Sequence, residues 1–390
     1  MADAAQFGAG DAGRRGMSGF IVKGWCPDAW RPMMAGDGLL VRVRPPLGRL
    51  TGPQIEGLCA AANAHGNGQI DLTSRANLQL RGASEESWPA LLAELQGIGL
   101  VDPDPVREGR GAILVQPDWC EGDDSHAIAT ELRARLDELP ELPGKVGFVV
   151  DAGPAPMLGE APGDFRIERG LGGELLLRAD GRATGIAVPR AEAVTILIRL
   201  AHWFVENGGH AAGRMARLSV PLPDWASGDR LPAPPARPWR PGAHPGGAVY
   251  GLPFGRISAE ALGAFVKQHG APIRLTPWRM LLAEGVAPTP AVGMVLEDTP
   301  ILHVDACVGA PACSQASVAT RDLATCLAPL VEGRLHISGC AKGCARARAA
   351  DWVLTGREGA FDLARDARAG AAPLHTGLTP ERAVALLGAC

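Results

Sequence analysis

Lysine is scarce in this sequence: only Lys23, Lys145, Lys267 and Lys342 stand among its 38 lysines and arginines. A genome rich in G and C would give this bias. Arginine also suits sites that bind many carboxylates, because its planar guanidinium makes two parallel hydrogen bonds to each. The net charge of -4 at pH 7 lacks the positive excess that nucleic-acid binding requires, so we expect no nucleic-acid partner.

Long apolar runs are absent as well. No segment approaches the roughly 20 apolar residues of a membrane-spanning helix, and Met1–Gly16 has no apolar signal core. We expect residues 1–17 to form a disordered leader, and we expect a cytoplasmic protein with no membrane partner. No GxGxxG motif follows a predicted strand, so the sequence predicts no nicotinamide-binding domain of its own.

The sequence has nine cysteines, and five of them lie within residues 307–344. In a reducing compartment such clustering favours a metal site over disulfides. Two pairs stand out, Cys307-x5-Cys313 and Cys340-x3-Cys344, and four thiolates in two pairs can hold a [4Fe–4S] cluster. Glycines beside each pair keep the backbone close to the ligands, so that spare amides can donate hydrogen bonds to sulfur. The sequence therefore predicts one such cluster.

Zinc is the alternative ligand for the four cysteines. Four-cysteine zinc sites usually have short C-x2-4-C spacing in both pairs, and the five-residue gap fits them poorly. Cys326 lies between the pairs on a predicted helix, and we interpret it as a core side chain. Cys59, on another helix, and Cys390, at the terminus, receive the same structural interpretation.

Two parts of the sequence repeat one another. The copies are 48–66 followed by 70–82, and 255–270 followed by 273–285. In each copy a helix is predicted behind an N-capping hydroxyl, Thr51 or Ser258, and it ends at a His-Gly pair typical of a helix C-terminus. A strand containing Leu-Thr follows. Such duplication predicts packing about a pseudo-two-fold axis, and a ligand can bind between the copies.

Helices and strands alternate along the rest of the chain, which indicates an α+β or α/β class. Further helices are predicted at 85–97, 126–138, 190–206, 316–329 and 380–388. Strands are predicted at 39–43, 113–116, 146–150, 301–304, 335–337 and 352–354. The proline-rich stretch 228–247 lacks any such pattern, and we expect it to be an extended linker.

The cysteine quartet, with gaps of five and three residues, resembles the cluster motif of the sirohaem-dependent sulfite and nitrite reductases. Counterparts of GDGLLVRVRPPLG, LTSRANLQLRG, LPGKVGFVVDAG and HISGCAKGCA occur in that superfamily, and the resemblance covers nearly the whole chain from about residue 18. It implies an α+β fold in which a ferredoxin-like half-domain and a cluster-type domain each occur twice, related by a pseudo-two-fold axis. The implied domains are the ferredoxin-like halves 18–84 and 248–295, a cluster-type domain without a cluster at 85–227, and the [4Fe–4S]-binding domain at 296–390.

The resemblance also implies a set of anion-binding residues. Arg42, in the segment LLVRVR, stands where the family has an arginine that binds the substrate anion. Thr73 and Arg75 stand at positions that contact macrocycle carboxylates, and Arg110 matches a further substrate-facing arginine. Arg107 is an alternative to Arg110, and a solvated surface charge is the alternative for each arginine.

Lys145 matches the first of two catalytic lysines, but the second lysine position is Gly147. Reduction of sulfite or nitrite needs protons delivered to a small anion, and two lysines beside it supply charge and protons. Loss of one lysine, while most of the arginines remain, favours a polycarboxylate macrocycle as the substrate. One family arginine is nevertheless replaced by Asp71, and Cys26 either faces the substrate or is a structural thiol.

Within the superfamily, the segments KGWCPDAWRPMMAGDGLLVRVR, RLTPWR and WVLTGREGAFDLARDARAGAAP resemble the precorrin-3B synthases of aerobic cobalamin biosynthesis. That resemblance implies hydroxylation of precorrin-3A at C20 with dioxygen, closure of a γ-lactone, and electrons from an NADH-linked reductase or a ferredoxin. It also implies a mononuclear non-haem iron, for which no facial-triad pattern shows ligands. His303 and His336, near the cysteine pairs, are either core residues or supports of the cluster loops.

Two rival functions stay open at this point. In a sirohaem-containing sulfite or nitrite reductase, Cys344 would bridge the cluster and the haem iron. In a non-catalytic iron–sulfur electron carrier, the positions of Arg42, Arg75 and Lys145 would have no explanation.

Overall fold

The computed structural model describes residues 14–15, 21–22 and 26–388. The chain forms two compact units. The larger unit contains Cys26–Met34 and Gly38–Thr299, and the C-terminal unit contains Ala35–Asp37 and residues 300–388. Among the described residues, no helix is both long enough and apolar enough to cross a bilayer.

The predicted leader 1–17 lies outside the described residues except at two positions. Arg14–Arg15 form β1, which pairs with β2 (Ile21–Val22) in antiparallel sense. Disorder of the leader stays a prediction.

The larger unit contains two copies of one motif, a 3₁₀ turn followed by a strand, a helix and a hairpin. The first copy is η1 (Pro46–Gly48), β5 (Arg49–Leu50), α1 (Gly52–His65), β6 (Gln69–Leu72) and β7 (Leu78–Ala83). The second copy is η5 (Pro253–Gly255), β15 (Arg256–Ser258), α7 (Ala259–His269), β16 (Ile273–Leu275) and β17 (Met280–Glu284). The likeness extends to the backbone, since Leu47 and Phe254 take φ values of 52° and 57° at the same point of the turn. The predicted duplication is confirmed.

Helices α1 and α7 begin at the predicted hydroxyl caps. The Thr51 hydroxyl accepts the N–H of Gln54 at 3.4 Å, and the Gln54 side chain accepts the N–H of Thr51 at 3.0 Å. The Ser258 hydroxyl accepts the N–H of Ala261 at 3.1 Å. These bonds satisfy amides that have no partner inside the helix. Gly270 ends α7 with a φ of 63°, a left-handed conformation that glycine adopts without steric cost.

Each copy places its first strand in the sheet of the other copy. The first sheet has the order β15-β6-β7-β4-β3 and the second has the order β5-β16-β17-β14-β13. The strands not yet given are β3 (Met33–Ala35), β4 (Gly38–Val43), β13 (Gly242–His244) and β14 (Gly247–Gly251). Thus Arg256 of the second copy pairs with Asp71, and Arg49 of the first copy pairs with Arg274. A pseudo-two-fold relation between the copies produces such a reciprocal exchange.

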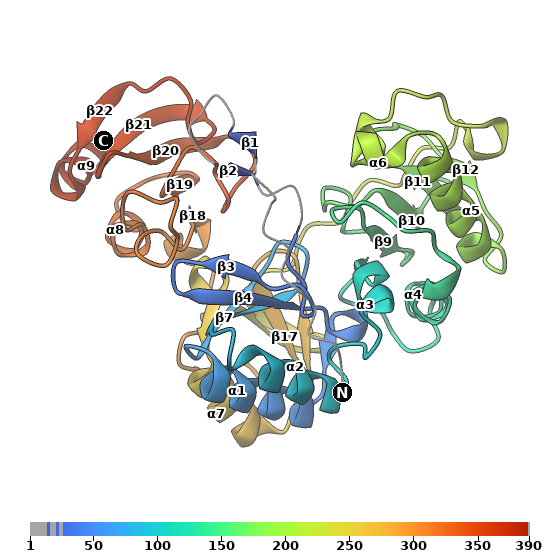
Figure 1. Ribbon diagram of the computed structural model, residues 1–390, viewed down its shortest axis with the longest axis horizontal. Coiled ribbons are helices and arrows are strands. Elements are labelled where there is room, and N and C mark those ends of the chain that lie inside the picture. The colour runs from blue at the N-terminus through green and yellow to red at the C-terminus, as the bar shows by residue number, and fades with distance from the viewer. Residues whose placement is uncertain (1–13, 16–20, 23–25, 389–390) are drawn as a thin grey trace. The chain divides into compact units, whose positions relative to one another are not determined.

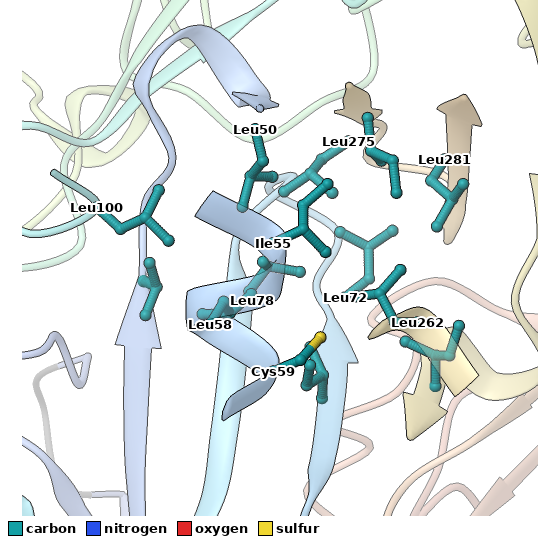
Figure 2. Close-up of a cluster of buried hydrophobic side chains, with 14 of the residues drawn as sticks. Leu50, Ile55, Leu58, Cys59, Leu72, Leu78, Leu100, Leu262, Leu275 and Leu281 are labelled. Carbon is teal, nitrogen blue, oxygen red and sulfur yellow. The ribbon is translucent and has the colours of Figure 1, made fainter. Parts of the chain in front are cut away.

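The two copies share one hydrophobic core. In Figure 1, α1, α2 (Trp88–Gly97) and α7 lie together on one side of strands β4, β7 and β17. Figure 2 shows Leu58 and Cys59 of α1 packed with strand residues of both copies and with Leu262 of α7. A cavity of about 20 Å³ remains between the copies, and its lining is entirely apolar. It has room for no more than a water molecule, so a ligand cannot bind inside this core.

The remainder of the larger unit is an α/β sheet of order β12-β11-β10-β9-β8. Its strands are β8 (Ile113–Val115), β9 (Phe148–Asp151), β10 (Phe165–Arg169), β11 (Leu175–Ala179) and β12 (Ile186–Ala187). The helices of this region are α3 (Pro105–Arg110), α4 (Asp124–Ala134), α5 (Ala193–Glu206) and α6 (Gly209–Ala212). Strands β8, β9 and β10 are parallel, whereas β10, β11 and β12 are antiparallel. Every residue of β9 is buried, as expected for a central strand between parallel neighbours.

The C-terminal unit repeats this sheet topology. Its strands are β18 (Val304–Ala306), β19 (Leu335–Ser338), β20 (Ala350–Arg357), β21 (Ala360–Ala367) and β22 (His375–Leu378), in that spatial order. The first three strands are parallel and the last three are antiparallel, as in the other sheet. Its helices are α8 (Arg321–Leu327) and α9 (Pro380–Leu387). Both sheet types therefore occur twice in the chain, and the fold is α+β.

Three expected elements differ from the structure. The predicted helix 316–329 begins only at Arg321, because amides before it bond elsewhere: the N–H of Ser317, for example, donates to the carbonyl of Gly339 at 3.0 Å. The predicted strand 301–304 is mostly a 3₁₀ turn, Pro300–His303. Strand β13 lies inside the stretch 228–247 that was expected to be a linker, since its residues pair with β14 as a hairpin.

Candidate functional site

Arg42 and Arg75, two of the predicted anion-binding arginines, are electrostatic neighbours in the larger unit. Strand β4 presents Arg42 between Val41 and Val43, which are both fully buried. Because side chains alternate along a strand, Arg42 lies on the opposite face from this core. Cys26 lies beside both arginines.

Thr73 shapes the turn that carries Arg75. Its hydroxyl accepts the N–H of Arg75 at 3.3 Å and the N–H of Asn77 at 3.2 Å, and Ala76 takes a φ of 51°. Thr276 does the same in the second copy, accepting N–H groups at 3.3 Å from two residues of its own turn. Thr73 thus has a defined local role, and its contact with a macrocycle carboxylate stays a prediction.

Among the described residues, neither arginine forms an ion pair with a carboxylate, although Asp28 lies near Arg42, Asp164 lies near Arg75, and the Cys26 thiol is hydrogen-bonded to Arg42. Burial lowers the pKa of the Arg42 guanidinium and that of Arg75, and the charge of Arg42 lowers the pKa of Arg75 further. The buried Nε of Arg42 has no hydrogen-bond partner, and within the described part of the chain neither arginine has a carboxylate at ion-pair distance. Partial burial of unpaired charge is unfavourable, and a bound anion would relieve it.

Arg75 also contacts the segment that holds Lys145 and Gly147. Its Nη2 donates to the carbonyl oxygen of Lys145 at 3.2 Å. Its Nη1 lies 3.7 Å from the point where a Cβ on Gly147 would stand. Lys145 itself is half-buried, and its ammonium makes no hydrogen bond to any described residue. The structure therefore brings Arg42, Arg75 and Lys145 into one region.

One residue of this region, Arg214, could not be identified from the sequence. Arg214, which follows α6, donates from Nε to both oxygens of Asp164, at 2.8 and 3.1 Å. Asp164 is fully buried and also accepts the N–H of Gly147 at 3.1 Å. The charge of Arg214 lowers the pKa of Arg75. Arg214 carries no motif, and only the fold shows that it lies here.

Arg110 makes its contacts elsewhere in the larger unit. Its Nη1 lies 3.4 Å from the carbonyl oxygens of Leu136 and Asp137. Arg107, the alternative to Arg110, forms ion pairs with Asp102 and Asp137. No contact in the described residues joins either arginine to Arg42 or Arg75. A substrate-binding role for Arg110 stays a prediction.

The second copy of the repeat does not carry an equivalent pair of cations. Strand register places Val249 where the first copy has Arg42, and the aligned turns place Trp278 where it has Arg75. Val249 packs with Met280, Leu282 and two tryptophans in an apolar cluster. The duplicated fold thus has one cationic face and one apolar face.

The four cysteines of the predicted cluster lie together at one end of the C-terminal unit's sheet. Cys307 follows β18 and Cys340 follows β19, and these strands are parallel neighbours. Cys313 and Cys344 follow within the same two loops, where Gly309 and Gly343 have φ values of 67° and 63°. The pKa of Cys340 is raised first by burial, and the charges of Cys313 and Cys307 raise it too. Cys344 interacts with the other three thiols in the same way.

The chemistry of these loops fits an iron–sulfur cluster. The N–H of Gly339 donates to the sulfur of Cys307 at 3.2 Å, and the N–H of Lys342 donates to that of Cys340. Amide bonds to sulfur stabilise thiolates and tune a cluster's potential. Among the described residues, no group of three or more His, Cys, Asp or Glu side chains, the four cysteines included, meets the geometry of a metal site. A mononuclear iron therefore has no assigned ligands in the structure.

The other cysteines and histidines considered in the sequence lie at different depths in the two units. Cys326 on α8 is exposed, so its interpretation as a core side chain is wrong: it lies on the outer face of a short helix. His336 lies on β19 and is fully buried, and His303 lies in the turn before β18. In the larger unit, Cys59 is buried as predicted. Cys390 lies outside the described residues.

Comparisons with known proteins agree with this architecture. Residues 31–98 match the family model of the nitrite/sulfite reductase ferredoxin-like half domain. The precorrin-3B synthase of a Sinorhizobium species is 35% identical over 93% of this chain and 86% of its own. The ferredoxin–nitrite reductase of Synechococcus elongatus is 25% identical over 85% of this chain and 78% of its own. The structure of the Mycobacterium tuberculosis NirA protein superimposes with a TM-score of 0.56 at 18% identity, covering 88% of this chain and 78% of that one.

The half-domain match and the NirA fold define the class, an α+β protein built on repeated nitrite/sulfite reductase ferredoxin-like sheets. Since 93% of its length is 35% identical to a precorrin-3B synthase, this chain belongs to the precorrin-3B synthase family of that class. The predicted fold class and the family resemblance are therefore confirmed.

Proposed function

We propose that this protein hydroxylates precorrin-3A at C20 with dioxygen and closes a γ-lactone from the ring A acetate, which gives precorrin-3B. One oxygen atom of dioxygen enters the product and the other leaves as water, with the uptake of two electrons and two protons. The observation that carries the proposal is the partly buried pair Arg42 and Arg75, without carboxylate partners, beside Gly147 in a chain of this family.

The arginines supply what a polycarboxylate macrocycle requires. Each guanidinium can bind a carboxylate through two parallel hydrogen bonds, and the cost of partial burial is offset when the anion binds. Thr73 holds the turn that presents Arg75. Lys145 is the residue that we expect to hold a proton near the substrate, because its ammonium has no partner among the described residues. Arg110 is a further candidate for contact with the substrate.

A sirohaem-dependent reductase is supported less well by this site. Its second lysine would stand at Gly147, and the first atom of that side chain would lie 3.7 Å from the Arg75 guanidinium. Without that lysine the site keeps its carboxylate-binding arginines but loses one of the two proton-donating side chains. The glycine therefore favours substrate clamping by Arg75 over delivery of protons to a small oxyanion.

We assign the [4Fe–4S] cluster to Cys307, Cys313, Cys340 and Cys344. When bound, the cluster would supply electrons one at a time, received from an NADH-linked reductase or a ferredoxin. The chain's own contribution is to hold the thiols at the ends of adjacent parallel strands and to donate amide hydrogen bonds to their sulfurs. A mononuclear iron is a further expected cofactor, without assigned ligands.

Incubation of the purified protein with precorrin-3A, an electron donor and isotopically labelled dioxygen tests the proposal. We expect a product that has gained one oxygen atom, with the label in the hydroxyl group, and no product when dioxygen is omitted. A product without the label, or no reaction by a protein that contains its full complement of iron, would overturn it.

The visible spectrum separates the rivals. Sirohaem gives strong Soret and red bands, whereas a [4Fe–4S] cluster alone gives one broad shoulder, which is the expected result. A non-catalytic electron carrier would not bind a tetrapyrrole, so a titration with one distinguishes it from either enzyme.

A further inference from the structure

Asp164 joins Gly147 to Arg214. One of its carboxylate oxygens accepts the N–H of Gly147 at 3.1 Å and lies 3.1 Å from the Nε of Arg214. The other oxygen accepts the Nε of Arg214 and the N–H of Met215, each at 2.8 Å. A fully buried carboxylate with this many donors is fixed in position, and it fixes Arg214 in turn.

The guanidinium of Arg214 uses only one of its donors in this pairing. Its Nε is bonded to Asp164, whereas neither Nη makes a hydrogen bond to a described residue. The Nη2 lies 4.0 Å from Asp180, at the limit of an ion pair. The Arg214 side chain is 21% exposed, so these free N–H groups can reach a ligand from solvent. The Nε of Arg214 is thus committed to Asp164, and the Nη edge is the part of the guanidinium that a ligand can reach.

Gly147 links Arg75 to Arg214 through Asp164. Asp164 binds the amide of Gly147, and Arg75 lies over the missing side chain of the same residue, 3.7 Å from its ideal Cβ. Arg42 is the other cation beside Arg75. Three guanidiniums thus lie near one another, and Asp164 balances only one of them through an ion pair.

We propose that Arg214 is a third carboxylate-binding residue of this site, held in place by Asp164, so that the site takes a tetrapyrrole through at least three separate carboxylates. This proposal rests on the proposed function, because it assumes that the Arg42–Arg75 region binds the macrocycle. It adds a residue that sequence motifs do not mark, and it makes the number of ligand carboxylates a determinant of affinity.

Binding of uroporphyrin, a stable tetrapyrrole with eight carboxylates, tests the proposal on the intact chain. We expect Arg214→Gln to weaken binding by roughly tenfold or more, the loss typical of one charge-assisted hydrogen-bonded pair. Arg217→Gln is the matched control, because Arg217 is an exposed arginine three residues further along the same segment. This variant should bind uroporphyrin with the affinity of the wild type. Coproporphyrin, which has four carboxylates, should bind the wild type more weakly.

The outcomes separate the two proposals. If the wild type does not bind uroporphyrin, the Arg42–Arg75 region is not a tetrapyrrole-binding site and the proposed function is overturned. If the wild type binds and the Arg214→Gln and Arg217→Gln variants bind equally well, Arg214 serves only Asp164 and the inference is overturned. Should Arg214→Gln fail to fold, Arg214→Lys decides in its place, since a lysine keeps the charge opposite Asp164 but loses the free Nη donors. Wild-type affinity in that variant would equally overturn the inference.

Discussion

The Nη1 of Arg75 lies 3.7 Å from the position that a Cβ on Gly147 would take. Nothing in the sequence motif requires this, because Arg75 lies in the hairpin of the first repeat and Gly147 precedes β9 of another sheet. Any side chain at position 147 would therefore start next to the Arg75 guanidinium. The contact places a guanidinium within ordinary contact distance of the position where the reductases of the superfamily are expected to have a lysine.

Replacement of Gly147 by lysine tests this relation. The new Cβ would lie 3.1 Å from the carbonyl oxygen of Ala112, and the side chain would place a second cation against Arg75. We expect Gly147→Lys to weaken uroporphyrin binding at least tenfold, because the new side chain crowds the Ala112 carbonyl and its charge repels Arg75. Fluorescence titration measures the affinity, and thermal unfolding shows whether the variant is folded.

Gly144→Lys is the control for that variant. Gly144 lies three residues earlier, at an exposed position, and a Cβ there would meet nothing within 4 Å. It adds the same charge without the contact, so its affinity should stay at the wild-type level or rise slightly. Equal affinities in the two lysine variants would show that the glycine has no part in holding Arg75.

Removal of the cations themselves makes a second prediction. Arg42→Gln and Arg75→Gln should each weaken uroporphyrin binding by roughly tenfold or more, because a charge-assisted hydrogen bond to a carboxylate contributes about 1.5–3 kcal/mol. Both variants should also unfold at a slightly higher temperature in the absence of ligand, since each loses a partly buried charge that forms no ion pair and whose largest perturbation is burial. Arg240→Gln, an exposed position, controls for the loss of one positive charge. A fall in stability without a fall in affinity would assign these arginines to the fold.

Much of the fold could be predicted from local signals. Thr51 and Ser258 cap helices where expected, and the aligned Leu-Thr segments form equivalent hairpins. The exchange of β5 and β15 between sheets could not be predicted, because strand pairing across some 185 residues leaves no local pattern. The helix expected at 316–329 failed for a similar reason, since amides such as that of Ser317 bond to the loop of the other cysteine pair.

The candidate site divides in the same way. Arg42 and Arg75 could be proposed from motifs, because short strand and turn segments carry them. Arg214 could not, because its ion pair with Asp164 spans 50 residues and neither residue lies in a recognisable segment. Physical proximity, read from the fold, was needed to join them.

The strand exchange between the copies makes a third prediction. Asp71 accepts two bonds from Arg256, at 2.7 and 3.1 Å, and its carboxylate also lies 3.9 Å from the nearly buried Arg81. Asp71→Asn would leave both arginines without this counter-charge, and we expect a loss of about 3 kcal/mol in the free energy of unfolding. Urea denaturation measures it. Asp229→Asn, which removes a carboxylate that is 95% exposed, should change stability by less than about 0.5 kcal/mol.

The buried carboxyl group of Asp151 should make the stability of the protein depend on pH. Burial raises the pKa of its carboxyl from 3.8 to about 6, although it accepts the N–H groups of Met157 and Leu158. Between about pH 4 and pH 6 the folded state therefore binds a proton that the unfolded state does not. Stability from this residue is greatest below the unfolded pKa and falls as pH rises through 6, by about 3 kcal/mol in all.

The measurement compares the wild type with Asp151→Asn in urea at several pH values. The difference in unfolding free energy, wild type minus variant, should fall as the pH rises from 4 to 7, because asparagine does not titrate. The same difference for Asp229→Asn should be nearly flat, since that carboxylate is exposed. A difference that rose with pH would mean that Asp151 is stabilised as the carboxylate, opposite to the effect of its burial.

The cysteine loops give the last prediction. Cys307→Ser, Cys313→Ser, Cys340→Ser and Cys344→Ser should each remove most of the cluster's visible absorbance and lower iron and sulfide together, because each thiolate is expected to hold one corner. Cys326→Ser is the matched control: it lies in the sequence between the two pairs but is exposed on α8, and its variant should keep full iron and sulfide content. If the wild type instead contained zinc and no sulfide, and the same four variants lost that zinc, the four cysteines would form a single-ion zinc site and not a cluster. Loss of the cluster from Cys326→Ser alone would mean that the ligand set itself is different, and that the two amide-bonded sulfurs of Cys307 and Cys340 do not belong to it.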